Sequence, residues 1–248
     1  MCCGEVMWEI TIKSSNNDLQ SLNYIQNALV LSLKQDVILG RYNAVNPCIS
    51  VACQDEKTNK TWNCIKKALC DIYCRHYKAQ YLAQKLTFLP QDNEYFDAFI
   101  RVCTYFDREL EYKIVFRMIK YMPILNLESY FAFKLRPLKK KWQDFCEIAN
   151  NNSKIFLSNE TFLSLLKFLI SSLDAKTDCV IVSPNDGCIT YLDEDNNQIL
   201  LPINNNISTI CALIDICPRK IILKGTKITP IFDIIKQFFE DKIDCQKN

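Results

Sequence analysis

Cysteine and histidine side chains on one predicted helix give the sequence its metal-binding character. Cys64, Cys70, Cys74 and His76 all lie in a helical pattern that spans residues 61–88. Cys70 and Cys74 stand four residues apart, so both thiolates can reach one ion from the same helix face. His76 lies about 200° around the helix from Cys74 and falls on the apolar stripe. Because a structural zinc site also uses a Cys-x2-Cys pair and a ligand from elsewhere, we expect packed thiols, no metal and no cofactor.

Catalytic patterns are weaker still. His76 is the single histidine, so a serine or cysteine nucleophile has one candidate partner, and no Gly-x-Ser-x-Gly elbow surrounds any serine. Adjacent carboxylates occur at Asp193, Glu194 and Asp195, where the pattern predicts a solvated hairpin tip. We therefore expect no catalytic residues and favour a protein that is not an enzyme. An enzyme of unrecognised type is the third interpretation.

Positive charge gathers in the middle of the chain. Eight basic residues and one acidic residue, Glu128, lie between Lys113 and Lys141. The densest part is called the basic segment here, and it consists of Lys134, Arg136, Lys139, Lys140 and Lys141. Aromatic residues interleave it, as they do on surfaces that bind nucleic acid, and an anionic membrane surface is a second possible ligand. Because lysine is almost never fully buried without a partner, we expect Arg136 and the three adjacent lysines to be at least partly exposed.

Two acidic stretches offer an internal alternative to such a ligand. Residues 92–111 carry six acidic and two basic side chains, and residues 174–195 carry six acidic side chains and one lysine. Either stretch can neutralise the basic segment inside the fold. The sequence leaves both possibilities open.

The composition excludes several classes of protein. The chain has 248 residues, is 49% hydrophobic and carries a net charge of +2, which excludes disorder as its main state and a generally basic nucleic-acid binder. Four glycines leave no room for a glycine-rich phosphate loop. The first residues show neither a basic nor an apolar signal region, and the fourteen cysteines mostly interrupt apolar runs. We expect a cytoplasmic protein with reduced thiols and no transmembrane segment.

Hydrophobic periodicity predicts the elements. Residues 8–13 alternate as a strand, Asp18 caps a helix to residue 33, and strands follow over 37–42 and 49–53. Helices are expected over 61–88 and from Asp92 up to Pro123, with a break near Arg108. A further helix ends at about residue 149, and another covers 162–173 with Ser158 or Asn159 as its cap. Strands over 179–183, 188–193, 198–202 and 220–224 alternate with helices over 207–217 and 231–240, and Ile243 begins a last strand. In that region Leu213, Ile216, Ile221 and Leu223 are expected to be buried around a Pro218-Arg219 turn.

The fold class is therefore α+β, or mixed α/β. We expect three consecutive regions, an N-terminal α/β region at 1–90, a helical middle at 91–154 and a C-terminal α/β region with a hairpin at 155–248. The second and third regions can form one domain.

Three stretches of the C-terminal half carry a resemblance to a known family: 126–136, Asn-Leu-Glu-Ser-Tyr-Phe-Ala-Phe-Lys-Leu-Arg; 191–194, Tyr-Leu-Asp-Glu; and 213–223, Leu-Ile-Asp-Ile-Cys-Pro-Arg-Lys-Ile-Ile-Leu. The first is similar to the "inleGFi-FRL" segment of the YtxC-like family of endospore-forming bacteria, which is associated with sporulation. The second resembles the family's hairpin and the third its "lI-iaPrkIiih" segment, so the resemblance covers residues 90–245. Lys134 replaces the usual arginine, and a second C-terminal cysteine after Cys245 is missing. The resemblance implies a role in endospore formation in a bacterial cytoplasm and no reaction. Our first interpretation is a protein that acts through binding, with a protein partner.

Overall fold

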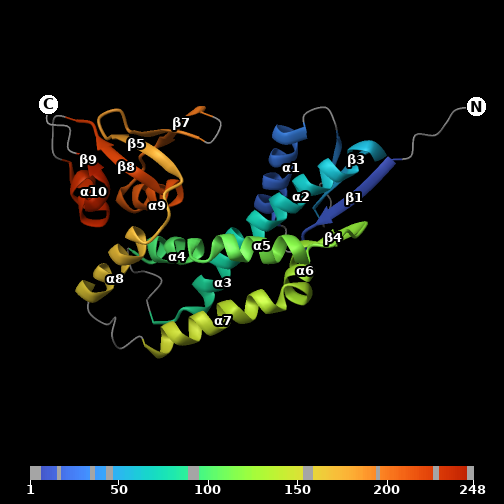
Figure 1. Cartoon of the computed structure of the whole chain (residues 1–248), viewed down its shortest axis with the longest axis horizontal. Helices are drawn as coiled ribbons and strands as arrows, with labels where there is room; N and C mark the ends of the chain where they lie inside the picture. The colour runs from blue at the N-terminus through green and yellow to red at the C-terminus, as the bar shows by residue number, and fades with distance from the viewer. Residues whose placement is uncertain are drawn as a thin grey trace, which may run out of the picture. The chain divides into compact units, whose positions relative to one another are not determined.

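The computed structural model describes residues 7–15, 18–33, 37–42, 47–88, 95–152, 159–193, 196–225 and 229–244. Their helices and two mixed sheets confirm the expected α+β fold (Figure 1). Several residues named above lie outside the described residues: Asp92, Ser158, Glu194, Asp195, Cys245 and the side chain of Asn159.

The chain forms two compact units, and each takes two separate stretches of sequence. The first unit contains residues 1–81 and 107–145, and the second contains residues 82–106 and 146–248. The three regions expected from the sequence are consecutive, so they do not coincide with these units. Residues 91–154 are divided between the two.

The first unit is built on a four-stranded sheet with the order β2-β3-β1-β4. The strands are β1 (Met7–Lys13), β2 (Ile38–Tyr42), β3 (Cys48–Gln54) and β4 (Ile124–Asn126). β3 pairs with β1 and β2 in antiparallel register, whereas β4 adds parallel to β1. Alternation places Ile10 and Ile12 of β1 in the core with no exposed surface. The first three strands were expected, and the short strand β4 was not.

Helix α1 (Leu19–Leu33) begins as the sequence indicates. The Asp18 side chain accepts a hydrogen bond from the Ser21 backbone N–H at 3.0 Å, which is the N-cap interaction. The apolar spacing predicts a buried face of Leu19, Leu22, Ile25, Leu29 and Leu33. The last four are buried, but Leu19 in the first turn is 46% exposed.

The long helix after β3 contains a change of pitch that the sequence analysis missed. It runs through α2 (Thr58–Asp71), a π-helical segment (Ile72–Tyr77) and α3 (Lys78–Lys85). The predicted stripe is buried at Ile65, Leu69 and Ile72, but the wider π turn then rotates the buried face. His76 was expected on this stripe and is half-buried instead, while its neighbours Tyr73, Cys74 and Tyr77 take the core positions.

Three further helices follow, of which two belong to the first unit and the third is shared by both units. α5 (Arg108–Met118) begins after Asp107, whose positive φ of 57° makes the break expected near Arg108. α6 (Leu127–Lys134) is capped by Asn126, whose Oδ1 accepts from the Ser129 N–H at 2.8 Å. α7 (Arg136–Asn151) follows at once and extends into the second unit.

The second unit has a five-stranded sheet with the order β7-β6-β5-β8-β9. Its elements are α4 (Phe96–Tyr105), α8 (Asn159–Ser171), β5 (Thr177–Ser183), β6 (Cys188–Leu192), β7 (Gln198–Pro202), α9 (Asn206–Ile216), β8 (Pro218–Leu223), α10 (Pro230–Phe239) and β9 (Ile243–Asp244). β5, β8 and β9 are parallel neighbours, and β6 and β7 are antiparallel. Gly187 closes the β5–β6 hairpin at φ 64°, as the Asp-Gly signal predicts.

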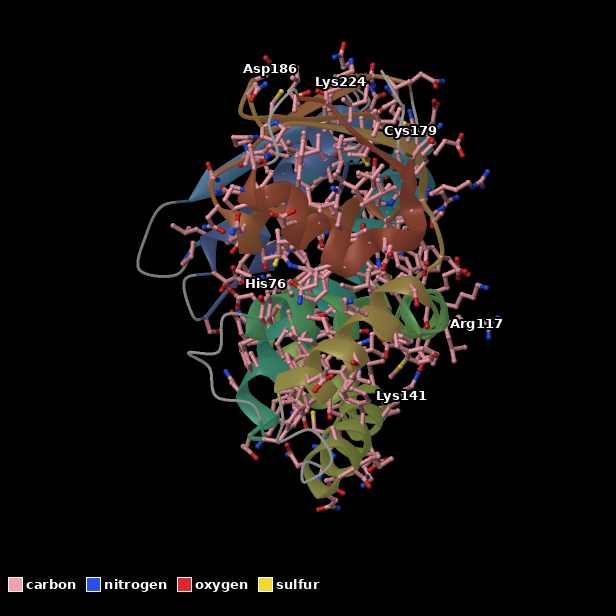
Figure 2. The ribbon with its side chains drawn as sticks, turned by 90° about the vertical axis from the view of Figure 1, so that its left-hand side faces the viewer. His76, Arg117, Lys141, Cys179, Asp186 and Lys224 are labelled. Atoms are coloured by element: carbon pink, nitrogen blue, oxygen red, sulfur yellow. The ribbon has the colours of Figure 1, made fainter. Side chains whose placement is uncertain are left out.

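One face of this second sheet is packed and the other is open. Val180, Val182, Ile189 and Ile221 have no exposed surface, and helices α9 and α10 lie on their side of the sheet (Figure 1). Figure 2 shows Cys179 and Lys224 along the strand layer at the top of the view, with helices of the same unit below it. Among the described residues of this unit, no helix covers the other face.

The β8 region corrects one expectation and confirms others. Leu213, Ile216 and Ile221 are buried as expected, but Leu223 is only half-buried. The chain turns at Cys217, which has a positive φ of 46° and donates its N–H to the Leu213 carbonyl at 3.0 Å. Pro218 and Arg219 are therefore the first residues of strand β8 rather than a turn.

Candidate functional site

The cysteine pair of the long helix is packed rather than poised for a ligand. Cys70 and Cys74 have no exposed surface, and the Cys70 thiol donates to the Tyr112 carbonyl at 3.9 Å. Burial raises the pKa of the Cys74 thiol to about 12 and raises the pKa of Cys70 as well, so both stay protonated at neutral pH. Over the described parts of the chain, no three His, Cys, Asp or Glu side chains are grouped so that they can hold a metal ion.

His76 contacts a polar cluster where β1, α1 and α6 begin or end. Its Nε2 lies 3.7 Å from Asp18 Oδ2 and 2.9 Å from Gln80 Nε2. In the same cluster the Ser14 hydroxyl donates to Glu128 Oε1 at 2.5 Å, and the Asp18 N–H donates to Ser14 Oγ at 2.9 Å. Because the Ser14 proton is directed at Glu128, this serine is not paired with the histidine as a nucleophile would be.

The polar cluster serves the fold of the first unit. Asp18 caps α1 through its other carboxylate oxygen, and Glu128 Oε2 accepts from the Ser15 N–H at 2.9 Å. These contacts connect the end of β1 to the first turn of α6 across more than a hundred residues. The sequence analysis identified the Asp18 cap but not its neighbours, because that long-range contact leaves no periodic signal.

A buried ion pair lies at the end of the π-helical segment. Lys78 Nζ lies 2.9 Å from Glu111 Oε2, and the two side chains are only 5% and 2% exposed. The Trp142 indole N–H donates to the other Glu111 oxygen at 3.0 Å. Every contact here joins helices, α3 with α5 and α5 with α7, so the arrangement fixes helix packing. Neither Lys78 nor Glu111 lies on the predicted apolar stripe, so periodicity gives no sign that this pair is buried.

The basic segment begins with two exposed residues, Lys134 and Arg136. Arg136 lies over the Phe133 ring, with its guanidinium carbon 5.9 Å from the ring centroid. Lys139 is half-buried and lies 5.4 Å from the centroid of Phe131.

The last two lysines of the segment have acidic partners. Lys140 Nζ lies 2.7 Å from Asp144, and Lys141 Nζ lies 3.0 Å from Asp107 and 3.7 Å from Glu111. Asp107 and Glu111 belong to the acidic stretch 92–111, so internal neutralisation applies to Lys141. The expectation that Arg136 and the three lysines are at least partly exposed is confirmed.

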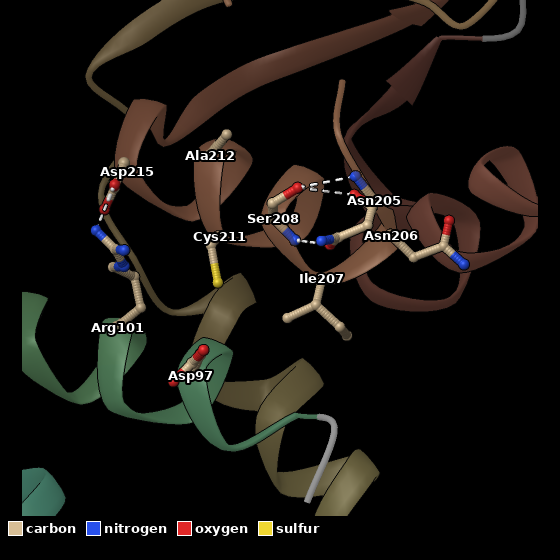
Figure 3. Close-up of a pocket in the computed structure, with 9 residues that line it drawn as sticks. All are labelled: Asp97, Arg101, Asn205, Asn206, Ile207, Ser208, Cys211, Ala212 and Asp215. Atoms are coloured by element: carbon tan, nitrogen blue, oxygen red, sulfur yellow. Dashed lines mark hydrogen bonds and ion pairs between the residues drawn. The ribbon is translucent and has the colours of Figure 1, made fainter. Parts of the chain in front are cut away.

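The second unit contains a cavity of about 890 Å³ between α4 and the first turns of α9 (Figure 3). Its wall consists of Asp97, Arg101, Asn205, Asn206, Ile207, Ser208, Cys211, Ala212 and Asp215. Two charged groups of this wall engage each other: Arg101 Nη1 lies 2.8 Å from Asp215 Oδ2, and the Tyr105 hydroxyl donates to Asp215 Oδ1 at 2.8 Å.

The remaining polar wall of the cavity is the start of α9. Asn205 Oδ1 accepts from the Ser208 N–H at 2.7 Å, and Ser208 Oγ accepts from the Asn205 N–H at 3.1 Å, which completes a capping box. Burial raises the pKa of the Cys211 thiol to about 11, so it is protonated and weakly nucleophilic at neutral pH. The cavity can accept a small polar molecule, but Ser208 is bonded within the capping box and the Cys211 thiol is protonated, so neither is an activated nucleophile.

Comparison with known proteins adds no relative. No protein family model, no curated protein and no solved structure matches the chain. Among the described residues, no helix combines the length and the apolar character needed to cross a bilayer.

Proposed function

We propose that the chain is a cytoplasmic, sporulation-associated protein similar to the YtxC-like family and that it acts by binding a protein partner rather than by catalysis. One observation carries the second part: three of the polar side chains considered for chemistry are bonded to neighbouring side chains. Glu111 is committed to Lys78 and Trp142, Asp215 to Arg101, and Ser14 to Glu128. A site for chemistry instead keeps an activated group facing an accessible space.

The first part rests on the resemblance, and several apolar residues of the resembling stretches lie in the core. Leu127, Tyr130 and Leu135 of the stretch 126–136 are at most 3% exposed, as are Leu213 and Ile221 of the stretch 213–223. A likeness in such positions favours a shared fold.

Disruption of the gene in its host tests the proposed process. We expect a lower yield of heat-resistant spores with normal vegetative growth, and recovery on expression of the intact chain. Unchanged spore yield, or absence of endospore formation in the host, would contradict the proposal. The matched control is a chain with Ile221→Asp, which we expect to accumulate poorly and not to restore the yield.

A second candidate is binding of an anionic ligand, a nucleic acid or membrane headgroups, by the basic segment. The observation that favours it is the exposed group of Phe133, Lys134 and Arg136, in which Phe133 is 64% exposed. An aromatic ring beside two cations is suited to a base or to a lipid interface.

Variants of the basic segment separate this candidate from internal neutralisation. Arg136, Lys139, Lys140 and Lys141 are replaced together by serine. Because Lys141 pairs with Asp107 and Glu111, we expect a folded protein that is less stable at low salt, with the difference closing as salt rises. The double variant Lys134→Ser/Arg136→Ser, which leaves the Lys140 and Lys141 ion pairs in place, is expected to keep its stability. If it also keeps its binding to single-stranded nucleic acid and to anionic vesicles, or if neither binds the intact chain, the candidate is rejected.

A further inference from the structure

Strand β7 is an edge strand with an unusual composition. It forms one end of the five-stranded sheet, and its five residues, Gln-Ile-Leu-Leu-Pro, include no charged side chain. Edge strands of monomeric proteins commonly carry lysine or other charges that prevent pairing with another chain. Leu200 at its centre is 61% exposed, and Leu192 on the neighbouring strand β6 is 53% exposed.

The hydrogen bonds around β7 show which backbone groups point outward. The Asp193 N–H donates to the Asn197 carbonyl at 3.0 Å, and the Ile203 N–H donates to the Gly187 carbonyl at 2.8 Å. Every second residue of a strand forms its backbone hydrogen bonds with the same neighbouring strand. The N–H and C=O groups of Ile199 and Leu201 therefore also bond to β6. The backbone N–H groups of Gln198 and Leu200 therefore point away from the sheet. The backbone carbonyls of Gln198, Leu200 and Pro202 point the same way.

The position of Pro202 agrees with this direction of the backbone groups. A proline lacks the N–H, and here the missing group would have pointed to the open edge, so the ladder with β6 loses nothing. The same proline limits what can pair with the edge: it accepts through its carbonyl but cannot donate. A partner strand must supply a donor opposite Pro202.

From these observations we infer that β7 pairs with β7 of a second copy of this chain, antiparallel, with Leu200 opposite its own counterpart. In this register each Leu200 N–H donates to the other Leu200 carbonyl, and each Gln198 N–H donates to the Pro202 carbonyl of the other copy. The pairing thus supplies the donor that Pro202 requires.

Side chains favour the same arrangement. Residues directly opposite in a sheet share a face, so the two Leu200 side chains meet on the open face. Leu192 is the diagonal neighbour of Leu200 on that face, because Thr190 pairs with Leu200 and Leu192 pairs with Gln198. The four leucines form an apolar group across the two-fold axis, and the uncharged strand brings no like charges together.

The dimer is expected to be weak. Five residues per strand bury less than the roughly 800 Å² per partner of a standard interface, so the dissociation constant should lie in the micromolar to submillimolar range. This inference concerns assembly, and it does not depend on the process in which the chain acts.

Sedimentation of the full-length protein in reductant, from about 10 µM to about 500 µM, tests the inference. We expect a monomer–dimer equilibrium that Leu200→Lys and Leu200→Glu each weaken at least about tenfold, because like charges then face each other. An equimolar mixture of these two variants should recover the dimer. Phe168→Lys on α8, where the ring is 64% exposed, is the matched control and should leave the equilibrium unchanged.

Three results would overturn the inference: a wild-type chain that stays monomeric at the highest concentration, a dimer that persists in both Leu200 variants, or charged variants that fail to recover the dimer when mixed. Circular dichroism of each variant shows that it is folded. A monomeric wild-type chain whose β7 amides become protected only with a different protein would assign the edge to that partner instead.

Discussion

The carboxylate of Glu111 is held among groups as buried as itself. Its two oxygens contact the Lys78 ammonium and the Trp142 indole N–H, and Lys141 lies within 3.7 Å. Removal of a charge from water costs several kcal/mol, and only well-placed partners offset it. This carboxylate therefore determines how α3, α5 and α7 can pack.

Replacement of this carboxylate gives a prediction at the scale of one residue. Glu111→Gln leaves the Lys78 charge buried without its partner, so we expect unfolding free energy to fall by about 3–5 kcal/mol. The exposed pair Lys140–Asp144 provides the control, because Asp144→Asn should cost about 0.5 kcal/mol or less. Urea unfolding of both variants measures the difference. Equal losses of unfolding free energy in the two variants would show that the buried pair contributes no more to stability than the exposed one.

Single elements were largely predictable where their apolar residues repeat with one period. β1 and α1 are examples, with Ile10 and Ile12 buried at period two and Leu22, Ile25 and Leu29 buried at helical spacing. The π-helical segment was not predictable in this way, since one wider turn changes the phase without any change in residue type. Strand β4 was missed as well, because its three residues gain their structure from pairing with β1.

The two faces of β8 yield a prediction at the scale of an element. Ile221 faces the packed side with no exposed surface, whereas the adjacent Ile222 faces the open side and is half-buried. From the sequence, aspartate at either position is expected to unfold the C-terminal region. The structure separates them: Ile221→Asp should prevent stable folding, while Ile222→Asp should remain folded with a smaller loss. Thermal unfolding followed by circular dichroism tests this, and similar losses at both positions would contradict an open face.

The buried thiols make the stability of the whole molecule depend on pH. Burial raises the pKa of Cys74 to about 12, and of Cys146 and Cys211 to about 11. An unfolded thiol loses its proton near pH 8.5, so above this pH the unfolded chain binds fewer protons than the folded chain. Unfolding free energy must then fall as pH rises.

We therefore expect the urea midpoint, measured in reductant, to decrease from about pH 8.5 to about pH 11. Cys74→Ala should lower stability at neutral pH, where it removes packed volume, yet reduce the slope at alkaline pH, since one titrating group is gone. A midpoint that stays constant up to about pH 10.5 would refute the assignment of these thiols to the folded core.

The organisation of the whole molecule was the least predictable level. The α+β class followed from the mixture of periods, but the two units did not, because their membership depends on long-range packing. α4, for example, packs with α8 and α9 of the second unit, although residues of the first unit flank it in sequence on both sides. The candidate sites show the same limit: the exposure of the basic segment and the acidic stretch 92–111 as its possible partner were predictable, but the particular pairing of Lys141 with Asp107 and Glu111 was not.

Because each unit takes two separate stretches of sequence, the ribosome synthesises the parts of one unit at different times. Phe99 and Ile100 of α4 leave the ribosome early, but α9, which packs on that helix, follows only after roughly a hundred further residues, or about 5–20 s of elongation. Until then α4 lacks its α9 partner, although α8 reaches it earlier and the first unit, whose last residue is 145, can already close. The nascent chain thus presents a defined binding target for a molecular chaperone before the protein is complete.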